Sequence, residues 1–343
     1  SPLTWTLLTL SLLLSTTLVL SSHHWVLVWL ALELNTMSIL PFIIKSHHPR
    51  ATEATTKYFL IQTATAALIL LAGMTNTWQT GQWHLTHMTA AASTIMTVAA
   101  MLKLGLAPIH FWFPEVMQGS TTLTALVFAT WQKLAPLGLI YLLTKTPSTT
   151  SLALGLISSL TGGWLGLNQT QMRKLLSFSS IAHMGWLVTA LTLCPKLATM
   201  TMITYIFMTT TTFMALAPTT TKTLLDLSIS HSCHPTLTSV ISLAVLSLGG
   251  LPPLSGFMPK WLILQELVLH QMPLLATTLA LSSLPSLYFY TRIAYLTALT
   301  APPNNPNTEH TWRFKFEATT ALPLLASLTT LALPLTPLIA HTL

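Results

Sequence analysis

Gly105-Leu106-Ala107-Pro108, with Pro114 six residues after Pro108, interrupts one long apolar stretch of the chain. Gly250-Leu251-Pro252-Pro253, with Pro259 at the same spacing, interrupts another. Both fit the pattern G-L-x-P-x5-P. Because proline removes a backbone donor and glycine tolerates left-handed backbone, each element predicts a helix that is broken in mid-course. The chain therefore contains an internal repeat centred on two broken helices.

The composition is that of a protein embedded in a membrane. Hydrophobic residues make up 52% of the chain and charged residues only 6%, whereas about a quarter of the residues of a soluble domain are charged. Apolar runs close to the roughly 20 residues that cross a hydrocarbon core recur from end to end. We therefore predict an all-α polytopic membrane protein of about eleven transmembrane helices, at residues 3–22, 25–44, 57–79, 88–118, 121–144, 149–168, 175–194, 198–218, 237–266, 273–297 and 319–340.

The two G-L-x-P elements lie in the fourth and ninth of these runs, which are too long for one straight span. Their odd separation makes the two copies run in opposite directions through the membrane. Inverted repeats with discontinuous helices near the membrane midplane are typical of secondary transporters, so we predict this fold. The alternative is that Gly and Pro are simply frequent in transmembrane helices.

With this assignment of spans, most of the positive charges in the loops fall on one face of the membrane. Since positively charged loops gather on the inner face of a membrane, we expect the N-terminus on that face and the C-terminus on the other. The N-terminal face would carry Lys45, Arg50, Lys57, Arg173, Lys174, Lys222, Arg292, Arg313 and Lys315, and the opposite face Lys145 and Lys196. No basic segment precedes the first apolar run, which we expect to be retained as a span.

Lys133 is the charge that lies deepest in an apolar run. It is about twelve residues, or roughly 18 Å of helix rise, from either end of its span, which is beyond the reach of a lysine side chain to the surface. Ionisable groups at such depth suggest an ion or proton pathway. Burial disfavours the charged form of a lysine, so that it can release a proton as an arginine would not. The alternative is a lysine held in a static ion pair.

Glu33 and Lys103 are predicted to act as a pair. Glu33 is enclosed by apolar neighbours in its run, and Lys103 lies at the first helix break, where unwound backbone and water can solvate a charge. A contact between their helices would reduce the cost of burying both charges. Lys260 and Glu115 occupy corresponding places in the two breaks, each directly after a proline. For Glu115, a solvated helix end is an equal alternative.

Two histidines lie inside apolar segments. His183 is in the middle of a predicted helix, close to Ser179 and Ser180, and His110 lies between the prolines of the first break. A lone buried histidine is more often a hydrogen-bonded structural group than a titrating one. Both therefore rank below the lysines as candidate proton carriers.

Other function classes find little support. The net charge of +7 is not gathered in a basic patch, so nucleic-acid binding is not expected. The cysteines, Cys194 and Cys233, suggest no disulfide framework, and the loop at 231–234 offers too few ligands for a metal. We find no phosphate-binding glycine loop, no nucleophile motif and no pair of histidines placed to hold haem. We expect this chain to bind no metal and no cofactor.

Four stretches of the chain resemble one known family. They are Lys103–Glu115, Asn168–Lys174, Ser179–Gly185 and Gly249–Lys260, in this order across nearly the whole chain. They resemble the antiporter-like subunits of respiratory complex I, which are related to multi-subunit cation/proton antiporters. The resemblance implies a single integral membrane domain over 1–343, made of inverted five-helix repeats at 1–147 and 148–298, a polar loop at 299–318 and a C-terminal helix at 319–343.

The resemblance also implies a function. The chain would be a proton-translocating membrane-arm subunit of NADH:ubiquinone oxidoreductase, and the chemistry of NADH, FMN, iron–sulfur clusters and ubiquinone would take place elsewhere in the complex. Glu33 and Lys103 would be the paired charges of a first half-channel, Lys133 the central relay and Lys260 the terminal lysine of a second. The implied partners are other membrane-arm subunits and lipids, in a hetero-oligomer of the mitochondrial inner membrane. The N-terminus would face the matrix and the C-terminus the intermembrane space.

Two alternatives stay open. A free-standing cation/proton antiporter could be built on the same inverted repeat. A structural membrane spacer could hold the same lysines in static pairs, and proton pumping would then survive the replacement of Lys133.

Overall fold

The computed structural model describes residues 2–143, 149–231, 234–300 and 321–335. All regular structure in these ranges is helical, apart from isolated bridges that pair His24 with His84 and Gln171 with Thr223. The predicted all-α class is therefore confirmed. Outside the described residues lie Lys145, Cys233, Arg313 and Lys315, the predicted polar loop from residue 301 onward, and the predicted C-terminal helix before 321 and after 335.

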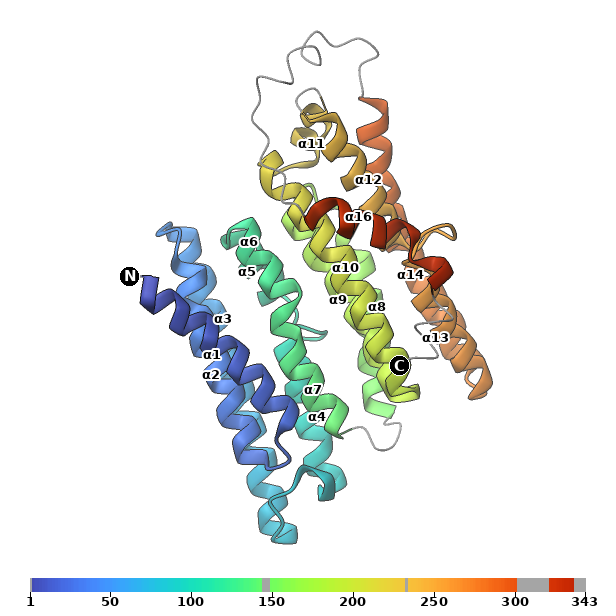
Figure 1. The fold of residues 1–343 in the computed structure, drawn as a ribbon. Helices are drawn as coiled ribbons and strands as arrows, with labels where there is room; N and C mark the ends of the chain where they lie inside the picture. The colour runs from blue at the N-terminus through green and yellow to red at the C-terminus, as the bar shows by residue number, and fades with distance from the viewer. Residues whose placement is uncertain (1, 144–148, 232–233, 301–320, 336–343) are drawn as a thin grey trace. The chain divides into compact units, whose positions relative to one another are not determined.

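The chain forms two compact units, Ser1–Leu154 and Gly155–Leu343, whose boundary lies close to the predicted junction of the repeats. In the first unit, α1, α2 and α3 run side by side, α4 packs against α3, and α7 contacts α1, α2 and α4 (Figure 1). Its helices are α1 (Pro2–Ser21), α2 (Trp25–Ile44), α3 (Pro49–Thr80), α4 (Ala90–Leu104), α5 (Trp112–Gly119), α6 (Thr122–Ala129) and α7 (Leu134–Leu143), with 3-10 turns η1 (Leu85–His87) and η2 (Trp131–Lys133).

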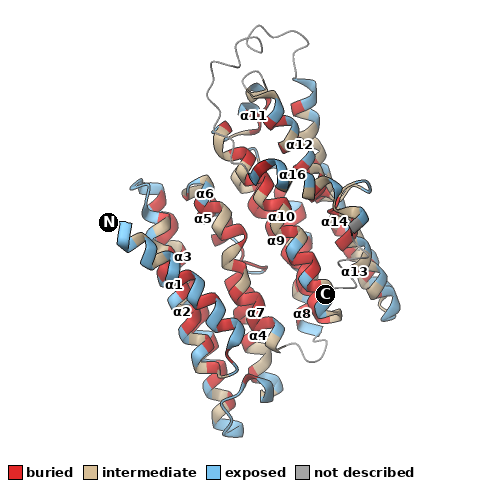
Figure 2. Ribbon diagram, viewed as in Figure 1, coloured by how far each residue is buried: buried red, intermediate tan, exposed pale blue. Residues whose placement is uncertain are grey.

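In the second unit, α10 contacts α9, α12, α13 and α16. Its helix α9 is buried along nearly its whole length (Figure 2). The described helices here are α8 (Thr149–Gly166), which begins just before the unit boundary, α9 (Met172–Leu193), α10 (Pro195–Thr219), α11 (Leu224–Ser230), α12 (Pro235–Gly249), α13 (Phe257–Leu269), α14 (Pro273–Leu299) and α16 (Ala321–Leu331), with the 3-10 turn η4 (Leu333–Leu335).

Among the described residues, 6 helical segments are long and apolar enough to cross a membrane. They are α1, α2, α3, the segment Thr122–Leu143, α9 and α10, and three shorter apolar helices are α4, α12 and α16. Leu3 and Leu10 of α1 are among many large apolar side chains that stay exposed, as expected for a surface in contact with lipid rather than water. The structure is therefore that of a multi-pass membrane protein.

Helix α3 begins earlier than the sequence predicted. The predicted run started at residue 57, but the helix starts at Pro49 and is 32 residues long. Proline fits the first position of a helix, and the side chain of His48 accepts a hydrogen bond from the backbone N–H of Arg50. The prediction followed hydropathy alone, and these polar first turns were therefore missed.

Both predicted helix breaks are confirmed. Helix α4 ends at Leu104 and α5 begins at Trp112, while α12 ends at Gly249 and α13 begins at Phe257. The residue that follows each first half is a glycine with left-handed backbone, Gly105 at φ 76° and Gly250 at φ 80°. Each donates its N–H to a carbonyl in the preceding helical turn, which is how a glycine ends a helix.

A third interruption lies in the run predicted as one span at 121–144. The α-helix stops at Ala129, the 3-10 turn η2 follows, and α7 resumes at Leu134. Pro136 explains the change, because it has no N–H to offer to the carbonyl of Gln132 four residues earlier. The N–H of Leu134 bonds instead to the carbonyl of Trp131, three residues back. The predicted run at 121–144 is thus present as the apolar segment Thr122–Leu143, with an irregular turn that the prediction did not include.

The structure also contains a short helix between two predicted runs. In α11, the side chain of Thr223 accepts from the backbone N–H of Asp226, and the Asp226 carboxylate accepts in return from the N–H of Thr223. This reciprocal capping begins the helix. The hydrogen bonds from Thr223, together with one from the backbone of Lys222, lower the pKa of Asp226 below its ordinary value.

Candidate functional site

Lys133 is the last residue of the turn η2, and its side chain is buried at 3% exposure. Its Nζ atom lies 5.0 Å from the centroid of the Phe113 ring. An ammonium over an aromatic face is attracted to it, more so when water is excluded. The irregular turn therefore directs a lysine into the interior of the first unit, as its depth in the sequence predicted.

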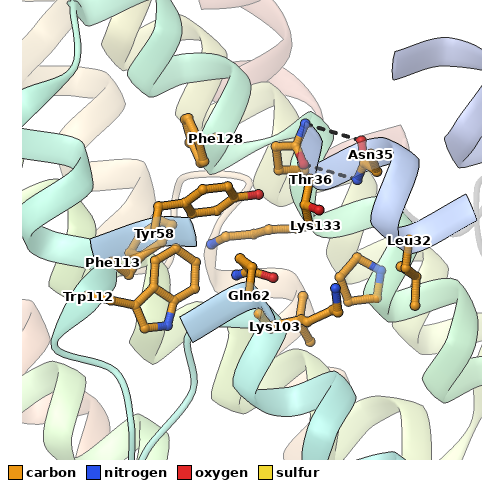
Figure 3. Close-up of a pocket in the computed structure, with 13 residues that line it drawn as sticks. Leu32, Asn35, Thr36, Tyr58, Gln62, Lys103, Trp112, Phe113, Phe128 and Lys133 are labelled. Carbon is orange, nitrogen blue, oxygen red and sulfur yellow. Dashed lines mark hydrogen bonds between the residues drawn. The ribbon is translucent and has the colours of Figure 1, made fainter. Parts of the chain in front are cut away.

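Lys133 and Lys103 line the same cavity (Figure 3). The cavity measures about 20 Å³, which is room for about one water molecule. The other residues around it come from α2, α3, α4, α5, α6, η2 and α7: Leu32, Asn35, Thr36, Tyr58, Gln62, Leu104, Trp112, Phe113, Phe128, Gln132 and Pro136. The structure thus brings together two of the predicted proton carriers from segments about thirty residues apart.

Lys103 lies in the last turn of α4, just before the first break, and is 6% exposed. Its Nζ atom has no hydrogen-bond partner among the described residues. A buried ammonium or amine in that position is costly unless water or a proton acceptor reaches it. The cavity beside Lys103 is large enough for the water that would complete its hydrogen bonding.

The Glu33 carboxylate is not in direct contact with Lys103. Within the described ranges, N···O contacts of 4.0 Å or less join Lys57 to Glu53 and Glu115, and none involves Glu33. The Glu33 carboxylate instead accepts a hydrogen bond from Thr36 at 3.2 Å. Glu33 still interacts electrostatically with Lys103. The pair predicted from the sequence is therefore a pair at a distance, with Thr36 on the side that faces the cavity.

Lys260 lies in the second unit, in the first turns of α13. Its Nζ atom donates a hydrogen bond of 2.8 Å to the carbonyl of Gly249, the last residue of α12. The end of the lysine side chain lies against Gly250, where an added Cβ would be 3.1 Å from Nζ. Carbonyl groups at a helix C-terminus attract cations. The side chain therefore spans the second break and interacts with the helix end that the break exposes.

The two predicted histidines have polar or aromatic neighbours. The Nε2 atom of His183 lies 3.5 Å from the hydroxyl of Tyr290, and its ring is 5.7 Å from the ring of Tyr205. His110 is 4% exposed, and its Nδ1 atom lies 3.2 Å from the carbonyl of Pro108 within the first break. The Tyr290 contact links α14 to α9 in the second unit, whereas the Pro108 contact is local.

Glu115 is more exposed than the other candidates. Its carboxylate lies 2.6 Å from the Nζ atom of Lys57, which also lies 2.6 Å from Glu53. The side chains of Lys57 and Glu115 are 41% and 45% exposed. Exposed ion pairs contribute little to stability. This geometry favours a solvated helix end that ties α5 to α3.

We expect Glu115→Gln to leave proton pumping and thermal stability close to those of the wild type, because water screens the Lys57 pair that it removes. Pumping in vesicles and the melting temperature of the assembled protein measure this. Glu53→Gln, which removes the other carboxylate beside Lys57, is the matched control. A severe loss of pumping with Glu115→Gln alone would instead place Glu115 on the proton path.

Sequence reasoning missed the polar residues that complete the cavity. Asn35, Tyr58 and Gln62 are each 3% exposed. Gln132 forms hydrogen bonds with Asn35 across the bundle. The available signal was their polarity inside apolar runs, which draws less notice than a charge because an amide or hydroxyl is far less costly to bury. In the described ranges, no three side chains of His, Cys, Asp or Glu are grouped as metal ligands.

Comparison with known proteins agrees with this architecture. A family model for the transmembrane part of NADH:quinone oxidoreductase and Mrp antiporters matches residues 22–285, and one for the C-terminus of NADH dehydrogenase subunit 2 matches residues 287–340. The NADH-ubiquinone oxidoreductase chain 2 of Gallus gallus is 50% identical over 333 residues, which are 96% of this chain and 96% of its own. That of Danio rerio is 51% identical over 96% of this chain and 95% of its own.

Solved structures share the fold. A chain of respiratory complex I from Thermus thermophilus superposes with a TM-score of 0.86 at 27% identity, over 98% of this chain and 79% of that one. A chain of the Mrp complex from Dietzia has a TM-score of 0.78 at 14% identity, over 97% of this chain and 75% of that one, and is similar in fold alone.

The broken helices, the buried lysines and these matches define an antiporter-type membrane protein. Within that class, the chain belongs to the NADH-ubiquinone oxidoreductase chain 2 family. The resemblance to antiporter-like subunits that the sequence motifs carried is confirmed.

Proposed function

We propose that this chain translocates protons as a membrane-arm subunit of NADH:ubiquinone oxidoreductase, and that Glu33, Lys103, Lys133 and Lys260 form its relay. The observation that carries the proposal is the cavity shared by Lys103 and Lys133, two buried lysines with room for one water between polar side chains. A water molecule in such a place can pass a proton from one amine to the other. No redox group is needed in this chain, because electron transfer elsewhere in the complex supplies the energy.

The same proposal covers the topology. In this proposal the chain has about eleven spans. They are arranged as two inverted five-helix repeats, whose discontinuous helices are α4–α5 and α12–α13. The two breaks support this arrangement, because each has a left-handed glycine after its first half. Lys103 lies two residues before the first of these glycines, and Lys260 lies against the second. The chain would lie in the mitochondrial inner membrane among other membrane-arm subunits and lipids. Its N-terminus would face the matrix and its C-terminus the intermembrane space.

Lys260 would continue the path in the second unit. Its hydrogen bond to the Gly249 carbonyl holds the amine at a helix break, where water has access to unwound backbone. His183, with the hydroxyl of Tyr290 beside it, is a polar group in the same unit that could hand protons onward. His110 lies at the first break and is a secondary candidate there.

Lys103→Met tests the proposal in the complex that contains this chain. We expect the rate of proton pumping per assembled complex to fall at least about tenfold, because the variant lacks one of the two amines on the cavity. Pumping is measured by the quenching of a pH-sensitive dye in vesicles driven by NADH and a quinone. Native electrophoresis controls for assembly.

Two results would contradict the proposal. Unchanged pumping with Lys103→Met would favour a membrane spacer whose lysines are static. Migration of the chain apart from any NADH-oxidising assembly in mild detergent would favour a free-standing antiporter of the same fold.

A further inference from the structure

A reciprocal amide pair joins α2 to the turn that carries Lys133. The Nδ2 atom of Asn35 donates to Oε1 of Gln132 at 3.0 Å, and Nε2 of Gln132 donates to Oδ1 of Asn35 at 3.4 Å. Figure 3 shows both bonds at Asn35, on the rim of the cavity. Two parallel bonds fix the rotation of each side chain as well as its distance from the other, which a single bond does not.

The backbone of the turn departs from the α-helical hydrogen-bond pattern. Pro136 offers no N–H to the Gln132 carbonyl, and the α-helical pattern gives way to a 3-10 turn at Trp131–Lys133. Gln132 directly precedes Lys133, so any rotation of the turn that moves one residue also moves the other. The amide pair therefore adds a lateral constraint where one α-helical hydrogen bond is missing.

The other side of the pair has a further contact, to α1. Asn35 is 3% exposed, and its Oδ1 atom also accepts a hydrogen bond of 3.3 Å from Ser15 of α1, a residue that is 0% exposed. The same stretch of α2 carries Glu33 and Thr36, whose side chains bond to each other. The amide pair thus connects the segment that bears Glu33 with the turn that bears Lys133.

We infer that Asn35 and Gln132 are positioning residues for proton transfer, which hold the Lys133 turn against α2 so that the amine stays on the cavity it shares with Lys103. This inference rests on the proposed function. Neither amide carries a proton itself. Without the pair, the turn loses this tether to α2, and the amine would spend less time on the cavity.

The test uses the complete complex with Asn35→Leu, Gln132→Leu, the double Leu variant, and the exchanged pair Asn35→Gln with Gln132→Asn. Leucine keeps much of the side-chain volume but none of the hydrogen bonds. Pumping per assembled complex is measured from pH 6 to 9, together with NADH:quinone activity. Ser282→Ala is the matched control, because it removes a buried interhelical hydrogen bond, to Ser159, that touches no lysine turn.

We expect each single Leu variant to lower pumping about threefold to tenfold and the double variant to do no worse than the poorer single, since the two residues act as one unit. The exchanged pair keeps two amides of the same combined length and should restore pumping to within about twofold of the wild type. The shape of the pH profile should change in the Leu variants and recover in the exchanged pair. Ser282→Ala should keep the wild-type rate and profile.

Three results would overturn the inference: losses that multiply in the double variant, an exchanged pair as inactive as the Leu variants, or a fall in assembly that accounts for the whole loss. Lys103→Met separates this failure from a failure of the proposed function. If pumping survives Lys103→Met, the proposed relay is wrong. If pumping is lost with Lys103→Met but kept with both Leu variants, only the positioning role of Asn35 and Gln132 is wrong.

Discussion

Lys133→Met is expected to lower proton pumping by at least about 100-fold, the lower end of the range for loss of a proton-transferring group. Methionine has nearly the length of lysine and no proton to exchange. Its flexible, apolar side chain also suits the surroundings, where Phe113 lies beside the amine and the residue is 3% exposed. The structure should therefore assemble, since the variant no longer has to bury a charged group.

Lys133→Arg provides the control for this variant. Arginine keeps a positive charge near Phe113 but holds its proton too tightly to act as a relay. We expect the arginine variant to lose pumping as the methionine variant does, and both to be present in assembled complex on native electrophoresis. Pumping in the arginine variant near the wild-type rate would mean that only the charge of Lys133 matters, and the relay would then be wrong.

The sequence was sufficient to predict the two helix breaks, and the reason is local. A glycine in left-handed backbone ends a helix through its own N–H, and both Gly105 and Gly250 adopt the left-handed conformation that the pattern predicts. The depth of Lys133 was also readable, because burial in a membrane protein follows from position within an apolar run.

The contacts between helices could not be predicted from the sequence. Asn35 and Gln132 are 97 positions apart, and no periodicity in the sequence pairs them. Glu33 and Lys103 were predicted as a pair because opposite charges attract, yet the Glu33 carboxylate bonds to Thr36, one turn further along its own helix. A local partner needs no particular packing between helices, whereas an ion pair between helices does.

Two local features of the structure were not predicted from the sequence, the turn at Lys133 and the hydrogen bond of Lys260. Pro136 removes an α-helical hydrogen bond next to Lys133. Other prolines lie inside continuous helices, namely Pro41, Pro218 and Pro285. A proline alone therefore does not predict the irregular turn. Lys260 was placed correctly at the second break, while its bond to the Gly249 carbonyl depends on the rotamer of a long side chain, which the sequence does not specify.

Gly256→Ala is expected to prevent most of the complex from assembling. Gly256 precedes α13 and has φ −69° and ψ −14°, backbone angles that any residue can adopt. Glycine is therefore needed here because there is no room for a side chain. An added Cβ would overlap the backbone oxygen of Ser247 and would lie 3.0 Å from the sulfur of Met208. Overpacking of this kind costs about 1–3 kcal/mol or more, and here the obstructing atom is backbone that has no free rotation to relieve the clash.

Gly249→Ala is the matched control on the other side of the same break. Its Cβ would meet Tyr290 at 3.5 Å, an ordinary contact, and alanine favours the helix in which the residue lies. The amount of assembled complex on native electrophoresis should therefore stay near the wild-type level with Gly249→Ala and fall severely with Gly256→Ala. Equal assembly of both variants would mean that Gly256 does not lie as close to the Ser247 carbonyl as the structure shows. The bond from Lys260 to Gly249 would then lose its geometric basis, because the same close approach of the two half-helices brings that amine to the end of α12.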